Sequence, residues 1–359
     1  MSLGPVMAGL SGLTLTAEER EMLQHPMVGA VILFSRNFEN ALQVKALIDE
    51  VHALRQPKLL VAVDHEGGRV QRFRSDFTRL PAVRNFGQLY DQDPKRAKRN
   101  CETAGWLMAV ELRAVGVDFS FAPVVDLDYG VSTVIGDRSF HRDPQAVAEL
   151  TQSYIKGMQR AGMAATAKHF PGHGAVEVDT HLGIARDERR LVDIESEDLI
   201  PFERLIHNGL AGVMAAHVIY PQVDDKPAGF SHFWLQRILR QQLQFQGVIF
   251  SDDLLMEGAA VAGDVCERAA AALTAGCDMA LVCSDFNAIC RTLDHLKKFD
   301  NAQCTRSARG AGSPASHLRL ARMHGRHPIT RDQLHNDPQW HQALHALGPW
   351  LEAKPVDLL

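Results

Sequence analysis

At 359 residues the chain is longer than one ordinary domain, but this length suits an α/β barrel, which takes roughly 250 residues before insertions. Apolar residues make up 46% and charged residues 23%, a composition typical of a globular protein and not of a disordered one. The net charge of −5 gives no electrostatic reason to expect nucleic acid or an anionic membrane as a partner. We therefore expect a small-molecule ligand and, since no long exposed apolar stripe is apparent, a monomer.

Six cysteines are present without any CxxC spacing, and we interpret them as reduced thiols. The first ten residues have neither the basic nor the apolar region of a signal peptide. No apolar run approaches the roughly 18 residues of a membrane span. These observations predict a cytoplasmic protein.

Short apolar runs alternate with helical patterns along the whole chain. Eight of the runs are predicted to be buried strands. They are Gly4–Leu10, Gly29–Phe34, Lys58–Asp64, Asp118–Asp126, Ala164–His169, Gly212–His217, Gly247–Asp252 and Asp278–Cys283.

Helices are predicted between these strands from apolar residues at three- and four-residue spacing. At the first of them, Thr16 with Glu19 three residues later predicts a capping box. The predicted helices are Ala17–Gln24, Asn40–Leu54, Arg96–Ala114, Pro144–Ala161, Glu195–Asn208, His232–Leu243, Val265–Ala275 and Asn287–Lys298. Strands that alternate with helices form a parallel sheet with right-handed crossovers, and eight repeats favour closure into a (β/α)8 TIM-type barrel.

The end of the chain differs in composition from the rest. We expect residues 1–299 to form a single catalytic barrel domain. From Asp300 to Ser316 the sequence shifts to Ala, Gly, Ser and Arg, which predicts an exposed loop. Weak helical patterns follow near His317–His324 and Pro338–Glu352, so residues 300–359 are predicted to form a small helical appendage that packs on the barrel.

The stretch Ala164–His181 concentrates groups that can move protons. Its first half predicts a buried strand that ends in Lys168 and His169, and its second half is a Gly- and Pro-rich loop that carries His173, Glu177, Asp179 and His181. A solvated strand end with an ordinary loop is the alternative for this segment alone. The density of such groups nevertheless makes the loop a candidate site.

Other predicted strands also end in polar residues. In a barrel the C-terminal strand ends form the active-site face, so these side chains are expected to meet there. Each has a plainer interpretation: Asp252 and Asp253 as helix caps, Asp64 as a structural partner of Arg69 or Arg72, and His217 as a core histidine. The polar strand ends and following loops hold Asp64, His65, Glu66, Arg69, Arg72, Asp126, Arg138, Lys168, His169, His217, Asp252 and Asp253.

The motifs in these segments resemble those of glycoside hydrolase family 3, and specifically its single-domain bacterial β-N-acetylhexosaminidases of cell-wall recycling. The resemblance spans nearly the whole chain and weakens after about Cys283. It rests on VILFSRNF, VAVDHEGGRVQRF, FAPVVDLD, IGDRSF, KHFPGHGAVEVDTH, AHVIY, GVIFSDDLLMEGA and AGCDMALVC, in this order.

The resemblance implies a retaining mechanism with residues of this chain in defined roles. The nucleophile is implied to be Asp252, directly after the Ser of the seventh strand end. The acid/base is implied to be His181, oriented by Asp179, because this family uses a loop histidine in place of a second carboxylate; a nearby carboxylate raises a histidine pKa and fixes its tautomer. Asp253 is then a helix cap or a supporting partner.

The same resemblance implies a clamp for the sugar hydroxyls. Its members are Asp64, Arg72, Arg138, Lys168 and His169. The implied substrate is a terminal non-reducing β-linked N-acetylglucosamine on peptidoglycan fragments, namely N-acetylglucosaminyl-1,6-anhydro-N-acetylmuramic acid with or without peptide. No cofactor or metal is implied. His65 receives no role.

Two other functions are open from the sequence. The first is a metal-dependent hydrolase on the same barrel, with ligands among His169, His173, Asp179, His181, His217 and Asp252. Those residue types suit zinc, but no HxH or HExxH spacing occurs and Lys168 would repel a cation. The second is a barrel that binds sugar without cleaving it, for which loss of Asp252 or His181 would be expected, and both residues are present.

Overall fold

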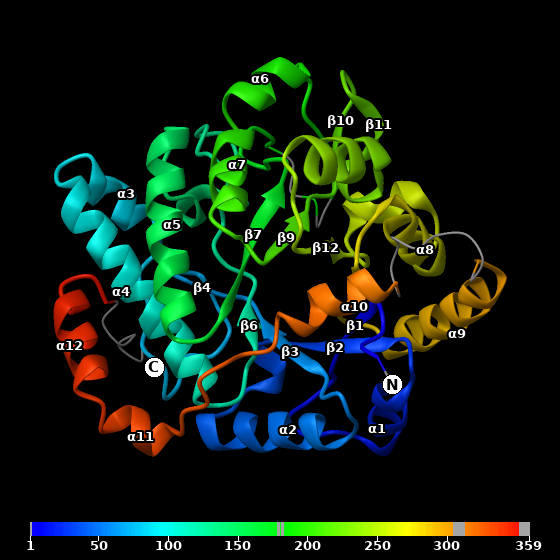
Figure 1. Ribbon diagram of the computed structural model, residues 1–359, viewed down its shortest axis with the longest axis horizontal. Helices are drawn as coiled ribbons and strands as arrows, with labels where there is room; N and C mark the ends of the chain where they lie inside the picture. The colour runs from blue at the N-terminus through cyan, green and yellow to red at the C-terminus, as the bar shows by residue number, and fades with distance from the viewer. Residues whose placement is uncertain (1, 178–179, 181–182, 304–312, 352–359) are drawn as a thin grey trace, which may run out of the picture.

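A closed barrel of eight parallel strands forms the centre of the molecule (Figure 1). The computed structural model describes residues 2–177, 180, 183–303 and 313–351. Each strand pairs with the one that follows it in the barrel and the last pairs with the first, which confirms the predicted fold class. The strands are β1 (Val6–Gly9), β2 (Val28–Leu33), β3 (Leu60–Val63), β6 (Phe119–Ser120), β7 (Ala164–Phe170), β9 (Gly212–Ala215), β12 (Val248–Asp253) and β13 (Met279–Val282).

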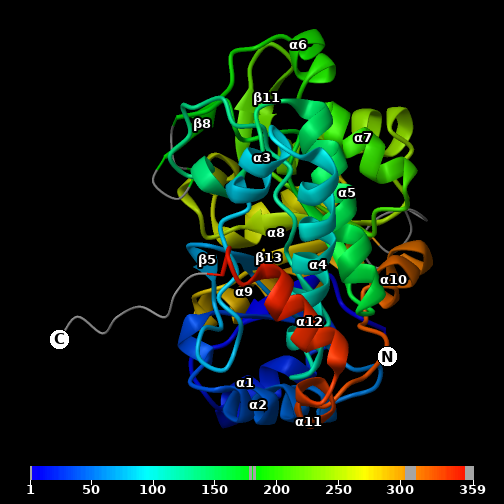
Figure 2. The ribbon, with the colours of Figure 1, turned by 90° about the vertical axis from the view of Figure 1, so that its left-hand side faces the viewer.

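Helices follow the barrel strands and surround them (Figures 1 and 2). The first begins as predicted, because the Thr16 hydroxyl accepts from the Glu19 amide and the Glu19 carboxylate accepts from the Thr16 amide. These helices are α1 (Ala17–Gln24), α2 (Ala41–Ala53), α4 (Pro94–Arg113), α5 (Pro144–Arg160), α7 (Leu199–His207), the π-helical η4 (Phe233–Gln242), α8 (Val265–Ala275) and α9 (Phe286–Gln303).

Shorter helices and strands lie in the segments that connect and follow these elements. The helices among them are α3 (Arg84–Tyr90), α6 (Leu191–Ser196), α10 (Pro314–Ala321), α11 (Arg331–His335) and α12 (Pro338–Leu347). The strands are β4 (His65–Gly67), β5 (Val70–Gln71), β8 (Ala185–Arg186), β10 (Val218–Tyr220) and β11 (Asp224–Pro227). Single 3-10 turns are η1 (Ser35–Asn37), η2 (Gly136–Arg138), η3 (Ala228–Phe230) and η5 (Glu257–Ala262).

Two predicted elements were wrong in extent. The strand predicted over Asp118–Asp126 pairs in the barrel only at Phe119–Ser120, because Pro123 has no N–H for the ladder and leaves a single further bridge at Val124. The helix predicted over Glu195–Asn208 is two helices, α6 and α7. Pro201 explains the break, since its ring clashes with the carbonyl four residues earlier in a continuous helix.

The loop predicted over Asp300–Ser316 is also shorter than expected. α9 continues to Gln303 and α10 already begins at Pro314. Pro at the first helical position after the Ser313 cap is a favoured start. The division of the chain at residue 299 stays a prediction.

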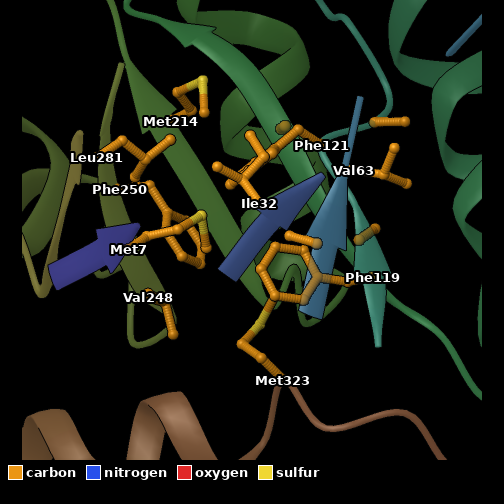
Figure 3. Close-up of a cluster of buried hydrophobic side chains, with 14 of the residues drawn as sticks. Met7, Ile32, Val63, Phe119, Phe121, Met214, Val248, Phe250, Leu281 and Met323 are labelled. Atoms are coloured by element: carbon orange, nitrogen blue, oxygen red, sulfur yellow. The ribbon is translucent and has the colours of Figure 1, made fainter. Parts of the chain in front are cut away.

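The barrel interior is filled by large apolar side chains from opposite strands (Figure 3). The rings of Phe119, Phe121 and Phe250 meet at centroid distances of 5.2–5.5 Å. Met323, from the segment after α10, points up beneath Phe119 and closes the N-terminal end of the barrel. The interior is therefore a packed core and not a channel.

The C-terminal helices pack on the barrel and its helices. α12 lies beside α4 in both views of the ribbon (Figures 1 and 2), and the Trp340 indole donates to the Glu111 carboxylate at 2.9 Å. Arg319 pairs with Asp278 at 2.6 Å at the start of β13. No helix in the described ranges combines the length and apolarity that crossing a membrane requires.

Candidate active site

A cavity of about 410 Å³ opens at the C-terminal ends of the strands, and we call it the upper cavity. Its floor is the top of the apolar core, where Ile32, Met214 and Leu281 emerge from three strands (Figure 3). Six of the eight predicted site residues line it, namely Asp64, Arg72, Arg138, Lys168, His169 and Asp252. The other two, Asp179 and His181, lie outside the described residues.

A chain of alternating charges runs along one wall of the upper cavity. Lys168 Nζ contacts Asp64 Oδ1 at 2.9 Å and Glu66 Oε1 at 2.7 Å. Glu66 accepts two hydrogen bonds of 2.8 Å from Arg138, and Arg72 lies 3.5 Å from Asp64. We call these five residues the charge ladder. Side-chain exposure rises from 3% at Lys168 to 18% at Asp64 and 32% at Arg72, so Asp64 and Arg72 are the members that a ligand can reach most easily.

Opposite charges within the charge ladder favour the ionised forms of Asp64, Glu66 and Lys168. Burial acts to raise the pKa of Asp64, but Lys168 and Arg72 beside it hold that pKa below its usual value. Burial acts to lower the pKa of Lys168, and the carboxylates of Asp64 and Glu66 raise it above its usual value. The wall therefore presents fixed donors and a fixed acceptor, which suits the hydroxyl groups of a sugar.

Glu66 belongs to the site although no role was assigned to it from the sequence. It is buried between Lys168 and Arg138. Burial acts to raise its pKa, but the two cations lower it strongly. Glu66 follows His65 directly in the HEGG motif. Since neighbouring strand residues point to opposite faces, this position could have indicated a carboxylate that faces the cavity. Its neighbour His65 instead packs on Phe73 and Phe77, where burial lowers the histidine pKa to about 3.

His169 is fixed by the buried carboxylate of Asp126. Asp126 Oδ2 lies 2.7 Å from His169 Nδ1, and Oδ1 accepts from the backbone amides of His169 and His173. A carboxylate only accepts, so Nδ1 carries the proton and Nε2 of the neutral ring is an acceptor. Asp126 is a second residue to which the sequence assigned no role in the site.

Asp252 is the next-to-last residue of β12, which lies between β9 and β13 in the barrel. Its Oδ1 accepts from the Asp253 amide at 2.8 Å.

Asp253 caps no helix; it accepts from the amides of Leu255 and Cys283, and so joins the ends of β12 and β13. The helix-cap interpretation of Asp253 was wrong, because the following helix α8 is capped by Asp264. Burial, with the charge of Asp252 beside it, raises the pKa of Asp253 to about 6.

The loop after β7 is held at several points. Thr180, which lies between the two predicted acid/base residues in the sequence, is buried in the cavity wall, where its hydroxyl is 3.3 Å from His173 Nε2 and its carbonyl accepts from the Gly258 amide. Burial lowers the pKa of His173 to about 4, so that ring is neutral at pH 7. The Tyr220 hydroxyl donates to the Gly172 carbonyl at 2.6 Å.

A polar network below this loop was not found from the sequence. Arg189 binds Asp187 and, at 2.7 Å, Asp198, and the Tyr129 hydroxyl lies 2.7 Å from carboxylate oxygens of both Glu197 and Asp198. The five residues come from three loops whose proximity only the folded barrel creates. They join residues 187–189, which follow the segment with the predicted acid/base, to the loops at Tyr129 and at Asp198.

Among the described members of the metal alternative's ligand set, His217 lies apart from the others. His217 stacks on Phe230 at 5.3 Å, its Nε2 lies 3.2 Å from the Asp253 carbonyl, and it does not line the upper cavity. This fits the core-histidine interpretation of His217. Across the part of the chain that the structure describes, no three His, Cys, Asp or Glu side chains form a group that could hold a metal ion.

Comparison with known proteins agrees with the motifs. Residues 6–308 match the model of the glycosyl hydrolase family 3 N-terminal domain. A β-hexosaminidase of Methylobacillus flagellatus is 55% identical over 349 residues, which is 97% of both chains, and one of Thioalkalivibrio sulfidiphilus is 55% identical over 96% of this chain and 95% of its own. The crystal structure of NagZ from Neisseria gonorrhoeae in complex with N-trifluoroacetyl-D-glucosamine superimposes with a TM-score of 0.87 at 43% identity, covering 97% of this chain and 98% of that one.

Proposed function

The chain belongs to glycosyl hydrolase family 3, and from this premise we propose that it is a retaining β-N-acetylhexosaminidase that releases terminal β-linked N-acetylglucosamine through a glycosyl-enzyme intermediate. It is a glycoside hydrolase of the β-hexosaminidase type. The proposal concerns the retention of the anomeric configuration and the identity of the substrate.

The observation that carries the proposal is the position of Asp252 in the same cavity as the charge ladder and His169. Retention requires a carboxylate that can reach the anomeric carbon of a sugar held beside it. The Asp253 amide binds one oxygen of Asp252 and so orients the carboxylate. In the first step an Asp252 oxygen forms a bond to the anomeric carbon while the bond to the aglycone oxygen breaks.

The proton for the leaving oxygen is assigned to His181, with Asp179 as its partner. The assignment rests on the DTH motif of this family, and Thr180 in the middle of the motif lies in the wall of the upper cavity. In the second step His181 takes a proton from water, whose oxygen attacks the anomeric carbon and releases Asp252.

The charge ladder and His169 are proposed to hold the sugar. Asp64 accepts from hydroxyl groups, and Arg72, Arg138 and Lys168 donate to them. Each hydrogen bond to a charged group contributes about 1.5–3 kcal/mol. A cavity of about 410 Å³ accommodates one hexosamine and leaves the aglycone near the mouth.

The proposed natural substrate is N-acetylglucosaminyl-1,6-anhydro-N-acetylmuramic acid, with or without peptide, in cytoplasmic recycling of peptidoglycan by a monomeric enzyme. The support is the likeness to NagZ and to the recycling enzymes of this family. The alternative, a metal-dependent hydrolase, predicts that chelation abolishes turnover.

The test compares three chromogenic substrates, the nitrophenyl β-glycosides of N-acetylglucosamine, N-acetylgalactosamine and glucose. We expect the N-acetylglucosaminide to have a kcat/KM at least about a hundredfold above that of the glucoside, as for an enzyme whose relatives are β-hexosaminidases. NMR of the first-formed product should show the β-anomer. A first product with the α-configuration would reject retention, and preference for the glucoside would reject the substrate class.

A further inference from the structure

A second cavity, of about 630 Å³, lies at the opposite end of the barrel, and we call it the lower cavity. It is bounded by the starts of β7, β9 and β12, by the ends of α5 and α7, and by residues 319–327, which comprise the end of α10 and the segment after it. It shares no lining residue with the upper cavity. Nothing in the glycosidase mechanism uses it.

The lining of the lower cavity is basic. It contains three arginines and three histidines and no Asp or Glu, in a chain whose net charge is −5. These basic residues are Arg319, Arg322, Arg326, His207, His324 and His327. Such a local excess of positive charge attracts anions.

Only part of this charge is neutralised by the protein. Arg319 pairs with Asp278, but that carboxylate is already shared with Arg240. Arg322 and Arg326 are exposed, and neither lies within 4.0 Å of a carboxylate of the described residues. Two guanidinium groups therefore face the lower cavity with their charge available.

The wall that carries these arginines is rigid. The Arg326 amide donates to the Gly162 carbonyl at 2.8 Å, and its carbonyl accepts from Arg113. Gly162 has φ of +80°, and a Cβ there would lie 2.3 Å from the Arg326 carbonyl oxygen, so the two segments are in direct contact. A fixed backbone lowers the entropy that an arginine loses when it binds a ligand.

The rest of the lining fits a ligand larger than an inorganic ion. Met163, Leu210 and Phe245 supply apolar surface, and Gln244 and Gln246 supply amide groups. The volume is within the range of small-molecule sites, roughly 300–1,000 Å³. We propose that the lower cavity binds a small organic anion whose phosphate or carboxylate groups pair with Arg322 and Arg326. This site is independent of the proposed glycosidase function.

The test titrates the full-length enzyme with pyrophosphate and, separately, with citrate in isothermal calorimetry at low ionic strength. The two probes distinguish phosphate from carboxylate recognition, which guanidinium groups bind in the same bidentate way. We expect saturable binding of at least one probe. In Arg322→Gln/Arg326→Gln the affinity should fall at least about tenfold, the loss expected when one charged hydrogen bond is removed.

Arg99→Gln is the matched control, because Arg99 is also exposed and outside the lower cavity. It should bind as the wild type does, and both variants should keep the wild-type kcat/KM for the chromogenic substrate. The proposal is overturned if neither probe binds at concentrations up to about 10 mM, if the double variant binds as tightly as wild type, or if Arg99→Gln loses as much affinity as the double variant. Failure of glycosidase activity alone would leave the binding result unaffected.

Discussion

Buried carboxylates lie beside cations at both ends of the barrel, but Asp64 and Glu66 at the upper end are bonded differently from Asp118 and Asp278 at the lower end. At the upper end, Asp64 and Glu66 accept only from side-chain cations among the described residues. At the lower end, Asp118 accepts from the backbone amides of Val61 and Gly325, and Asp278 accepts from that of Ile249. A carboxylate bonded to the main chain holds segments together, whereas one bonded to side chains can exchange a partner for a ligand. The contrast sets Asp64 and Glu66 apart from Asp118 and Asp278, while Asp126 and Asp252 at the upper end also accept from backbone amides.

The largest expected effect is at the upper end, in Asp252→Asn. The amide oxygen of Asn can still accept from the Asp253 amide, so the melting temperature should stay within a few degrees of wild type. The nucleophile is lost, and kcat should fall by several orders of magnitude. In the wild type, mass spectrometry after reaction with a slow fluorosugar should find the glycosyl adduct on Asp252. An adduct on Asp253, or none, would refute the assignment.

The next effect depends on the leaving group. His181→Ala should reduce cleavage of the natural disaccharide far more than cleavage of a nitrophenyl glycoside, whose leaving group needs little protonation. Asp179→Ala should show the same selectivity in milder form. Steady-state kinetics on both substrates is the measurement. Equal losses on the two substrates, or a larger selective loss in Glu177→Ala, would mean that the proton comes from elsewhere.

The charge ladder should show intermediate effects. Lys168→Ala and Arg138→Ala each remove charged hydrogen bonds worth about 1.5–3 kcal/mol, so kcat/KM should fall about tenfold or more. Glu66→Gln tests whether the buried carboxylate positions Lys168. It should lower kcat/KM by a similar factor and weaken binding of N-acetylglucosamine itself, because Lys168 loses one of its two anionic partners. If Lys168→Ala and Arg138→Ala both stay within a few-fold of wild type, the clamp is wrong.

At the lower end the expected loss is in stability and not in activity. Burial acts to raise the pKa of Asp118, but the nearby His324 and His52 rings and the hydrogen bond from the Gly325 amide hold that pKa well below its usual value. Asp118→Asn should therefore reduce the free energy of unfolding at pH 7 by about 3 kcal/mol, with kcat/KM at 25 °C within a few-fold of wild type.

The pH dependence of that loss gives a further check. A lowered carboxyl pKa stabilises the folded state above the unfolded pKa of about 3.9, and this contribution disappears as the pH falls towards the folded pKa. The difference in melting temperature between wild type and Asp118→Asn should therefore shrink between pH 5 and pH 3. A constant difference across this range would show that packing, and not ionisation, accounts for the loss.

The sequence predicted the barrel because each strand is a short apolar run between amphipathic helices. This pattern can be recognised without knowledge of any tertiary contact. It also indicated the upper end, since Lys168, His169 and Asp252 are polar residues at the ends of such runs. Glu66 and Asp126 were harder to assign, because their partners Arg138 and His169 come from other strand ends. The Tyr129, Arg189 and Asp198 network was missed for the same reason. Strand β6 was predicted too long because apolar residues around Pro123 look like a strand although the proline cannot pair as one.

Met323 has a consequence for the order in which the molecule can be completed. It follows the eighth strand in the sequence, yet its side chain covers the bottom of the core beneath Phe119 (Figure 3), and the neighbouring Gly325 amide binds Asp118. While a ribosome has released only the eight strands, that end of the core still faces water. A nascent chain can thus pair all eight strands while the lower end of its core is still exposed to chaperones and proteases. This exposure ends only when the segment after β13 that carries Met323 has emerged.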